Sequence, residues 1–201
     1  MRKYIFIFTG ILLAFAVSCG SISESGNSQK KALLIIPSAN VQDVELTTVQ
    51  NVLTESGVIV TVASLEGKTV NGSEGGFFEP DLKLADVKVK NYDMVTCIGG
   101  GGVFILLKNK EIISLVQEFH KKGKYVTAIC ASCVILANAG ILEGVKATCY
   151  PEPTFVNMMK DSGAEYIREK VVVSGKIITG NGPGASQPFA EALAASLTDS
   201  R

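Results

Sequence analysis

Two hydrophobic patterns alternate along the chain. Continuous apolar runs are typical of strands that are buried on both faces of a parallel sheet. Such runs occupy residues 31–37, 58–64, 92–98 and 124–129. Apolar residues spaced three or four apart, often followed by glycine, predict amphipathic helices. These stretches occupy residues 43–57, 110–123, 131–140, 154–163 and 186–197. Strands that alternate with helices predict an α/β fold with a mostly parallel sheet and helices on both faces.

Three shorter segments complete the pattern. Residues 65–87 are rich in glycine and predict loops with short strands, and residues 146–150 predict one short strand. Residues 169–180 alternate in polarity around Ser174 and Gly175, which predicts a β-hairpin.

The first 19 residues predict an export signal rather than part of the fold. A short basic start is followed by the apolar run "IFIFTGILLAFAV", which is too short for a comfortable membrane span. The run ends in "AVSCG", which resembles a bacterial lipoprotein signal in which Cys19 is lipidated. An ordinary secretory signal cleaved nearby is the alternative. We therefore predict an exported lipoprotein, anchored on the periplasmic or surface face of a bacterial membrane.

The rest of the chain predicts one tethered domain. Residues 20–30 are polar and rich in serine and glycine, as in a flexible tether. Residues 31–201 are long enough, in a chain that is 47% hydrophobic, to bury a sizeable core. Basic and acidic residues number 19 each, so no positive field indicates a nucleic-acid partner. Neither a dinucleotide-binding nor a P-loop glycine motif is present, so no nucleotide cofactor is predicted.

Cysteines are the candidate reactive groups. The predicted domain contains Cys97, Cys130, Cys133 and Cys149. An exported compartment permits disulfides, so an even count leaves two bridges open. A metal site is not predicted, because there is one C-x-x-C pair and a single histidine, His120, far from it in sequence.

Three features fall at the carboxyl ends of predicted strands, where ligands bind in open α/β sheets. Cys130 lies between a strand and a helix, where free backbone N–H groups and the positive helix end are expected to lower the pKa of its thiol. The turn Gly99–Gly102 could offer backbone donors to an oxyanion. Glu45 lies in the first turn of the first helix. Each also has an ordinary structural explanation: a small buried thiol, a tight turn, and a helix-favouring acid.

At these residues the chain resembles the ThiJ/PfpI family. The matching pieces include "KALLIIP", "DVE", "YDMVTCIGGGG", "GKYVTAICAS" and "VVVSGKIITGNGPGAS". The resemblance implies a flavodoxin-like three-layer sandwich of the class I glutamine-amidotransferase type, a homodimer and no cofactor. It also implies that Cys130 is the cysteine of a nucleophile elbow and that Glu45 touches its sulfur as a protonated carboxyl.

The resemblance implies further site residues as well. Backbone N–H groups of Gly100 and Ala131 would form an oxyanion site, and Gly99, Gly101 and Tyr150 would line the same pocket.

Three departures from the family pattern narrow the function. Family members with peptidase-like chemistry carry histidine where this chain has Ala131, and family members often carry histidine where it has Tyr150. His120 lies in the charged end of a helix, so no Cys-His-acid triad is predicted and peptidase activity is disfavoured. Asn181 stands where the family has an arginine in "S-R-G-P-G". The expected function is therefore glyoxalase- or deglycase-like processing of small reactive dicarbonyls or their adducts, by a hydro-lyase or hydrolase.

Two alternatives of other classes stay open. A reactive cysteine is also prone to oxidation, and Cys133 or Cys149 could resolve an oxidised Cys130 in a redox sensor. Cys133 could instead face the core, in register with the apolar side of its helix. The domain could also be a non-catalytic, chaperone-like binding module.

Overall fold

The computed structural model describes residues 29–198, which form a seven-stranded central sheet. Its strands, in spatial order, are β10 (Val171–Ser174), β11 (Ile177–Gly180), β7 (Tyr125–Ile129), β6 (Met94–Cys97), β1 (Lys31–Ile35), β2 (Ile59–Ser64) and β5 (Leu82–Lys83). The β10–β11 pair is antiparallel and is the predicted hairpin, whereas the other neighbours are parallel. The predicted signal, Cys19 and most of the tether lie outside the described residues.

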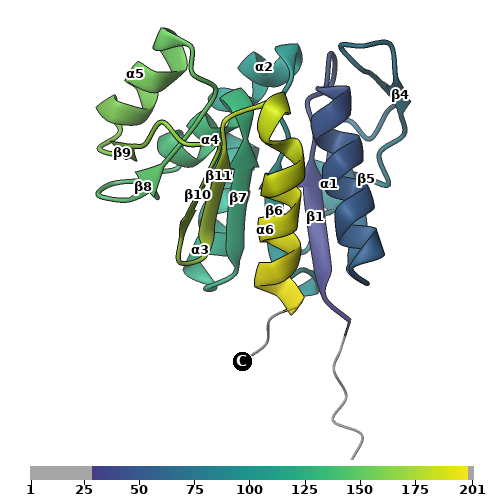
Figure 1. The fold of residues 1–201 in the computed structure, drawn as a ribbon. Helices are drawn as coiled ribbons and strands as arrows, with labels where there is room; N and C mark the ends of the chain where they lie inside the picture. The colour runs from purple at the N-terminus through teal and green to yellow at the C-terminus, as the bar shows by residue number, and fades with distance from the viewer. Residues whose placement is uncertain (1–28, 199–201) are drawn as a thin grey trace, which may run out of the picture.

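Helices cover both faces of this sheet (Figure 1). Helices α1 (Asp43–Glu55) and α6 (Ser186–Thr198) lie side by side on one face, and α3 (Lys110–Lys121) and α4 (Cys133–Asn138) lie on the other. Helices α2 (Phe104–Leu107) and α5 (Pro153–Asp161) lie toward the carboxyl ends of the strands. The predicted three-layer, flavodoxin-like sandwich is confirmed. None of the described helices is both long and apolar enough to cross a membrane.

The core lies on both sides of the central strands. In β1, every residue after Lys31 is buried, because this strand packs against helices on both faces. Five 3₁₀ turns connect the larger elements: Leu84–Asp86, Val89–Asn91, Gly101–Val103, Cys130–Ser132 and Pro183–Ala185. Two small sheets lie outside the main one: β3 (Val70–Asn71) with β4 (Phe77–Phe78), and β8 (Lys146–Ala147) with β9 (Glu165–Tyr166).

Two local differences from the prediction have physical causes. The helix expected at residues 131–140 is α4 preceded by a 3₁₀ turn, because Cys130 takes a left-handed conformation that an α-helix cannot include. The strand expected at residues 146–150 ends after Ala147 and joins β9 rather than the main sheet. Its next residue, Thr148, donates its N–H to Oγ1 of Thr179 at 2.9 Å instead of to a strand backbone.

Candidate active site

Cys130 occupies a sharp turn between β7 and α4. Its φ of +66° is in the left-handed region, a conformation that costs a non-glycine residue about 1–3 kcal/mol and must be held by its surroundings. Ser132 provides part of that support, because its hydroxyl donates to the carbonyl oxygens of Cys97 at 2.7 Å and Ile129 at 2.5 Å. The N–H of Tyr150 donates to the carbonyl oxygen of Cys130 at 3.2 Å. The turn is therefore tied to β6, β7 and the segment after β8.

Glu45 is completely buried beside this turn. Its Oε2 accepts the backbone N–H of Gly99 at 2.9 Å, and the carboxyl also hydrogen-bonds with the Cys130 side chain. Burial raises the pKa of Glu45 to about 7, although the hydrogen bonds from Gly99 and Cys130 oppose the rise. A carboxyl with that pKa exchanges its proton readily at neutral pH, which suits a general acid or base.

The turn after β6 is shaped by close approaches. A Cβ on Gly99 would lie 2.6 Å from both Cβ of Cys130 and Oε2 of Glu45, so a side chain there would displace the reacting pair. Gly100 has a φ of +125°, and a Cβ on it would lie 2.3 Å from the carbonyl oxygen of Asn40. Gly99 was expected to serve the oxyanion site, but its N–H is already engaged by Glu45.

The expected lowering of the Cys130 pKa is wrong. Burial raises the pKa of the Cys130 thiol, and negative charge on Glu45 raises it further, whereas the N–H groups of Ala131 and Gly100 lower it. The helix effect is weak here because α4 has only six residues and begins three residues after Cys130. Glu45 and Cys130 therefore titrate as a pair that carries at most one negative charge at neutral pH.

The other three cysteines of residues 29–198 do not reach the surface. Cys97, Cys133 and Cys149 are free thiols with no exposed area. The Cys133 sulfur donates to the carbonyl oxygens of Ala128 at 3.3 Å and Gly180 at 3.5 Å, so this side chain faces the core. The Cys149 sulfur donates to the carbonyl oxygen of Tyr150 at 3.4 Å. Of the two alternatives for Cys133, a resolving thiol or a core residue, the structure therefore shows the core residue.

A cavity of about 530 Å³ opens above the sulfur. Its lining includes the predicted site residues Cys130, Gly100, Gly101, Ala131 and Tyr150. It also includes residues that the sequence did not single out: Gln42, Ser73, Val103, Phe104, Glu152, Thr154, Phe155 and Pro183. Of these, Phe104 had a usable signal, because it is an apolar residue two positions after the glycine turn.

A buried carboxyl against a cysteine on a strained strand-to-helix turn is thus built into a flavodoxin-like sheet. A family model described as the DJ-1/PfpI family matches residues 30–196. The chain belongs to the DJ-1/PfpI family. This is the family that the sequence motifs indicated.

Several DJ-1/PfpI relatives match over most of their length. A glutathione-independent glyoxalase of Caenorhabditis elegans is 32% identical over 163 residues, covering 81% of this chain and 86% of the relative. A deglycase of Pyrococcus horikoshii is 30% identical over 151 residues, covering 75% and 90%. The crystal structure of a ThiJ/PfpI domain protein from Brachyspira murdochii has a TM-score of 0.82 and 30% identity, covering 86% of this chain and 99% of that one.

Within this DJ-1/PfpI fold, no histidine reaches the cavity. His120, the one histidine of the whole chain, is exposed near the end of α3 and is absent from the cavity lining. Among residues 29–198, no three histidine, cysteine or acidic side chains gather closely enough to hold a metal ion. The arrangement therefore offers a thiol, a carboxyl and backbone donors for chemistry.

Asp43 holds one wall of the cavity and was not predicted. Its carboxylate accepts the N–H groups of Gly76 at 2.8 Å and Glu74 at 2.9 Å, and the hydroxyl of Ser73 at 3.4 Å. Slight desolvation would raise the pKa of Asp43, but these hydrogen bonds outweigh it and lower the pKa. The loop 72–76, which carries the cavity residue Ser73, is thereby fastened to the start of α1.

Proposed function

We propose that this protein is a cysteine-dependent, cofactor-free enzyme of the glyoxalase or deglycase type, acting on small reactive dicarbonyls or their adducts. The observation that carries the proposal is the contact between the buried Glu45 carboxyl and the Cys130 side chain at the floor of an open cavity. The family relatives named glyoxalase and deglycase support the same chemistry.

The first step is addition of the Cys130 sulfur to the aldehyde carbon of a 2-oxoaldehyde. A carbon–sulfur bond forms, the carbonyl oxygen takes up a proton, and a hemithioacetal results. The proton originates from the thiol, and Glu45 can relay it because its pKa lies near neutrality. The N–H groups of Gly100 and Ala131, which face the sulfur, are placed to donate to the developing oxyanion.

The second step moves hydrogen from one carbon to the other. Glu45 removes the proton from the former aldehyde carbon and a proton returns at the neighbouring carbon, so the ketone becomes an alcohol and the hemithioacetal becomes a thioester. Water then hydrolyses the thioester, releases a 2-hydroxy acid and restores the thiol. The sequence consumes one water and needs neither an external oxidant nor a reductant.

The same groups are poorly suited to catalyse peptide hydrolysis. The amine leaving group of a peptide must be protonated as it departs. In peptidase-like sites a histidine commonly does this, and His120 is exposed on α3 outside the cavity lining.

The test is production of hydroxy acid from methylglyoxal by the purified domain and two variants. Cys130→Ser and Glu45→Gln should each lower kcat/KM by about 100-fold or more, because each removes a group that acts in proton transfer or bond formation. Glu55→Gln, an exposed acid at the other end of α1, is the matched control and should keep wild-type activity. Full turnover by Cys130→Ser or Glu45→Gln would refute the mechanism.

A redox-responsive thiol is the second candidate function. Cys130 lines the cavity and is 8% exposed, whereas the other three cysteines among the described residues have no exposed area. One family structure, at 28% identity, is that of Toxoplasma gondii DJ-1 in an oxidised form. Oxidation of Cys130 alone would make the protein a sensor without a resolving thiol.

We also propose that a lipid on Cys19 and the tether that follows it hold the domain at a bacterial membrane. The support is the sequence pattern, since Cys19 lies outside the described residues. Full-length protein expressed in bacteria should sediment with membranes, and Cys19→Ser should release it. Sedimentation of both forms alike would contradict the anchor.

A further inference from the structure

Three aromatic side chains form one continuous wall of the cavity. The rings of Phe104 and Phe155 have centroids 5.7 Å apart, and those of Tyr150 and Phe155 have centroids 6.5 Å apart in an edge-to-face arrangement. Phe155 is 7% exposed, whereas Tyr150 and Phe104 are 42% and 64% exposed. Two of the three rings therefore present apolar surface to whatever enters the cavity.

This wall begins beside the reactive sulfur. A Cβ built on Gly182 would lie 2.9 Å from Cδ2 of Tyr150 and 3.9 Å from the Cys130 sulfur. The Tyr150 ring and the Cys130 thiol thus lie on either side of this Cβ position. A group attached to a carbon that is bonded to the sulfur is therefore within reach of the Tyr150 ring.

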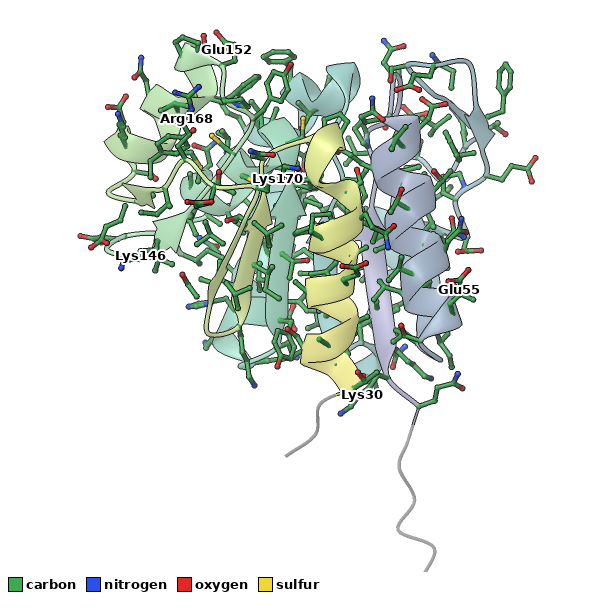
Figure 2. All side chains as sticks on the ribbon, viewed as in Figure 1. Lys30, Glu55, Lys146, Glu152, Arg168 and Lys170 are labelled. Atoms are coloured by element: carbon green, nitrogen blue, oxygen red, sulfur yellow. The ribbon has the colours of Figure 1, made fainter. Side chains whose placement is uncertain are left out.

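The same cavity lacks positive charge. No lysine, arginine or histidine among residues 29–198 is part of its lining, but Glu152 is. Figure 2 shows Glu152 at the end of the molecule where α5 begins and Lys30 at the opposite end; Arg168 and Lys170 lie nearer to Glu152 but are not part of the lining. Glu45 lies beside the sulfur, outside the lining, and adds no positive charge. An anionic substituent would lose water here without meeting a counter-charge among the lining side chains, which is unfavourable.

We propose that the cavity selects dicarbonyls whose second carbonyl carries an uncharged, apolar group as large as a phenyl ring, and that it rejects carboxylate- or phosphate-bearing analogues. Phe104 and Tyr150 would contact that group, and Glu152 would repel anions. The catalytic part of this inference rests on the proposed function, whereas selection at Cys130 can be measured without turnover.

Selection is tested by alkylating Cys130 with three reagents that share one iodomethyl carbonyl group. Iodoacetamide is neutral and small, iodoacetanilide adds a phenyl ring, and iodoacetate is an anion. The alkylation rate at Cys130 is followed by peptide mass spectrometry in the domain of residues 29–198. Each rate is then divided by the rate of the same reagent with 2-mercaptoethanol. We expect iodoacetanilide to exceed iodoacetamide by about tenfold and iodoacetate to fall below it by about fivefold or more.

Variants locate the cause of the selection. Phe104→Ala should remove most of the preference for iodoacetanilide, and its solvent exposure makes the substitution safe for folding. Phe77→Ala is the matched control, because Phe77 is 79% exposed on β4 and does not line the cavity. Glu152→Gln should raise the relative rate of iodoacetate. Equal normalised rates for the three reagents, or a preference that survives Phe104→Ala, would overturn the proposal.

Turnover provides a second measurement. Wild-type kcat/KM for phenylglyoxal should exceed that for methylglyoxal by about tenfold, and Phe104→Ala should narrow this ratio. A ratio of one with active enzyme would refute the selectivity and leave the proposed function standing. Absence of turnover of both substrates would refute the proposed function, and the alkylation rates would still decide whether the wall selects apolar groups.

Discussion

The backbone N–H of Gly99 donates to Oε2 of Glu45 at 2.9 Å, so the glycine turn holds the carboxyl in place rather than holding a substrate. The same hydrogen bond also fixes the position of the second carboxyl oxygen, Oε1. Oε1 is buried and, among the described residues, accepts no hydrogen bond of ordinary geometry. The carboxyl lies against Cys130, so a proton on Oε1 would satisfy that oxygen and could be donated toward the sulfur. The glycine turn therefore prepares Glu45 to act on Cys130.

The stability of the domain should fall as Glu45 ionises. The pKa of Glu45 rises from 4.5 to about 7 on folding, so the folded state holds this proton more tightly than the unfolded state. The stability that Glu45 contributes is fully present below its unfolded-state pKa of 4.5. It is lost as the pH rises through its folded-state pKa of about 7. The free energy of unfolding in urea should drop by roughly 2–3 kcal/mol more between pH 5 and pH 8 in wild type than in Glu45→Gln.

Glutamine is the suitable comparison because its carbonyl oxygen can still accept the Gly99 N–H, but it cannot ionise. Glu55→Gln, at an exposed position, should show the wild-type pH profile. Parallel profiles for wild type and Glu45→Gln would mean that burial does not shift the Glu45 pKa.

Gly99→Ala should inactivate the site by displacing Cys130 and Glu45 from each other. A Cβ 2.6 Å from both Cβ of Cys130 and Oε2 of Glu45 must push them apart, and a misplacement of about 1 Å can cost about 100-fold in rate. We expect a comparable loss of kcat/KM for methylglyoxal in a protein whose far-ultraviolet circular dichroism is unchanged. Gly184→Ala is the control, because a Cβ at Gly184 meets nothing within 4 Å. Retained activity in Gly99→Ala would show that the pair has room to move.

Much of the fold could be predicted because its signals are local. The strand from Lys31 is apolar along almost its whole length, and the hairpin at Ser174 and Gly175 alternates in polarity, so each indicates its own structure. The short strand β9 (Glu165–Tyr166) carries no such pattern. It exists because it pairs with β8, from which helix α5 separates it in the sequence.

The site was predictable only as far as strand ends meet at one sheet edge. Cys130 directly follows β7, and Glu45 lies in the first turn of the helix that follows β1, so topology alone brings them together. The raised pKa of Cys130 was not predictable, because it depends on how deeply neighbouring segments bury the sulfur. Phe155 and Asp43 were missed for the same reason: their partners come from distant parts of the chain.

Asp43→Ala should loosen the loop 72–76. The substitution leaves the N–H groups of Glu74 and Gly76 without their acceptor, so their hydrogen exchange should quicken while exchange in β1 does not. Because Ser73 lines the cavity, KM for methylglyoxal should rise severalfold with a smaller change in kcat. Asp43→Asn retains one acceptor oxygen and should restore part of the protection. Unchanged exchange of the loop in Asp43→Ala would show that Asp43 does not fasten it.

Peroxide should oxidise Cys130 without forming a disulfide, and slowly at neutral pH because burial raises the pKa of its thiol. Cys133 has no exposed area, and its sulfur is bound to the carbonyl oxygens of Ala128 and Gly180, so it cannot attack an oxidised Cys130 unless α4 moves. Trypsin places Cys130 and Cys133 in one peptide, residues 125–146, and Cys149 in the next, residues 147–160. The first peptide should gain two oxygens at Cys130, as expected for a sulfinic acid, and Cys133→Ser should leave that product unchanged. Loss of two hydrogens from the first peptide, or a cross-link between the two peptides, would instead identify Cys133 or Cys149 as a resolving thiol and favour the redox candidate with a disulfide.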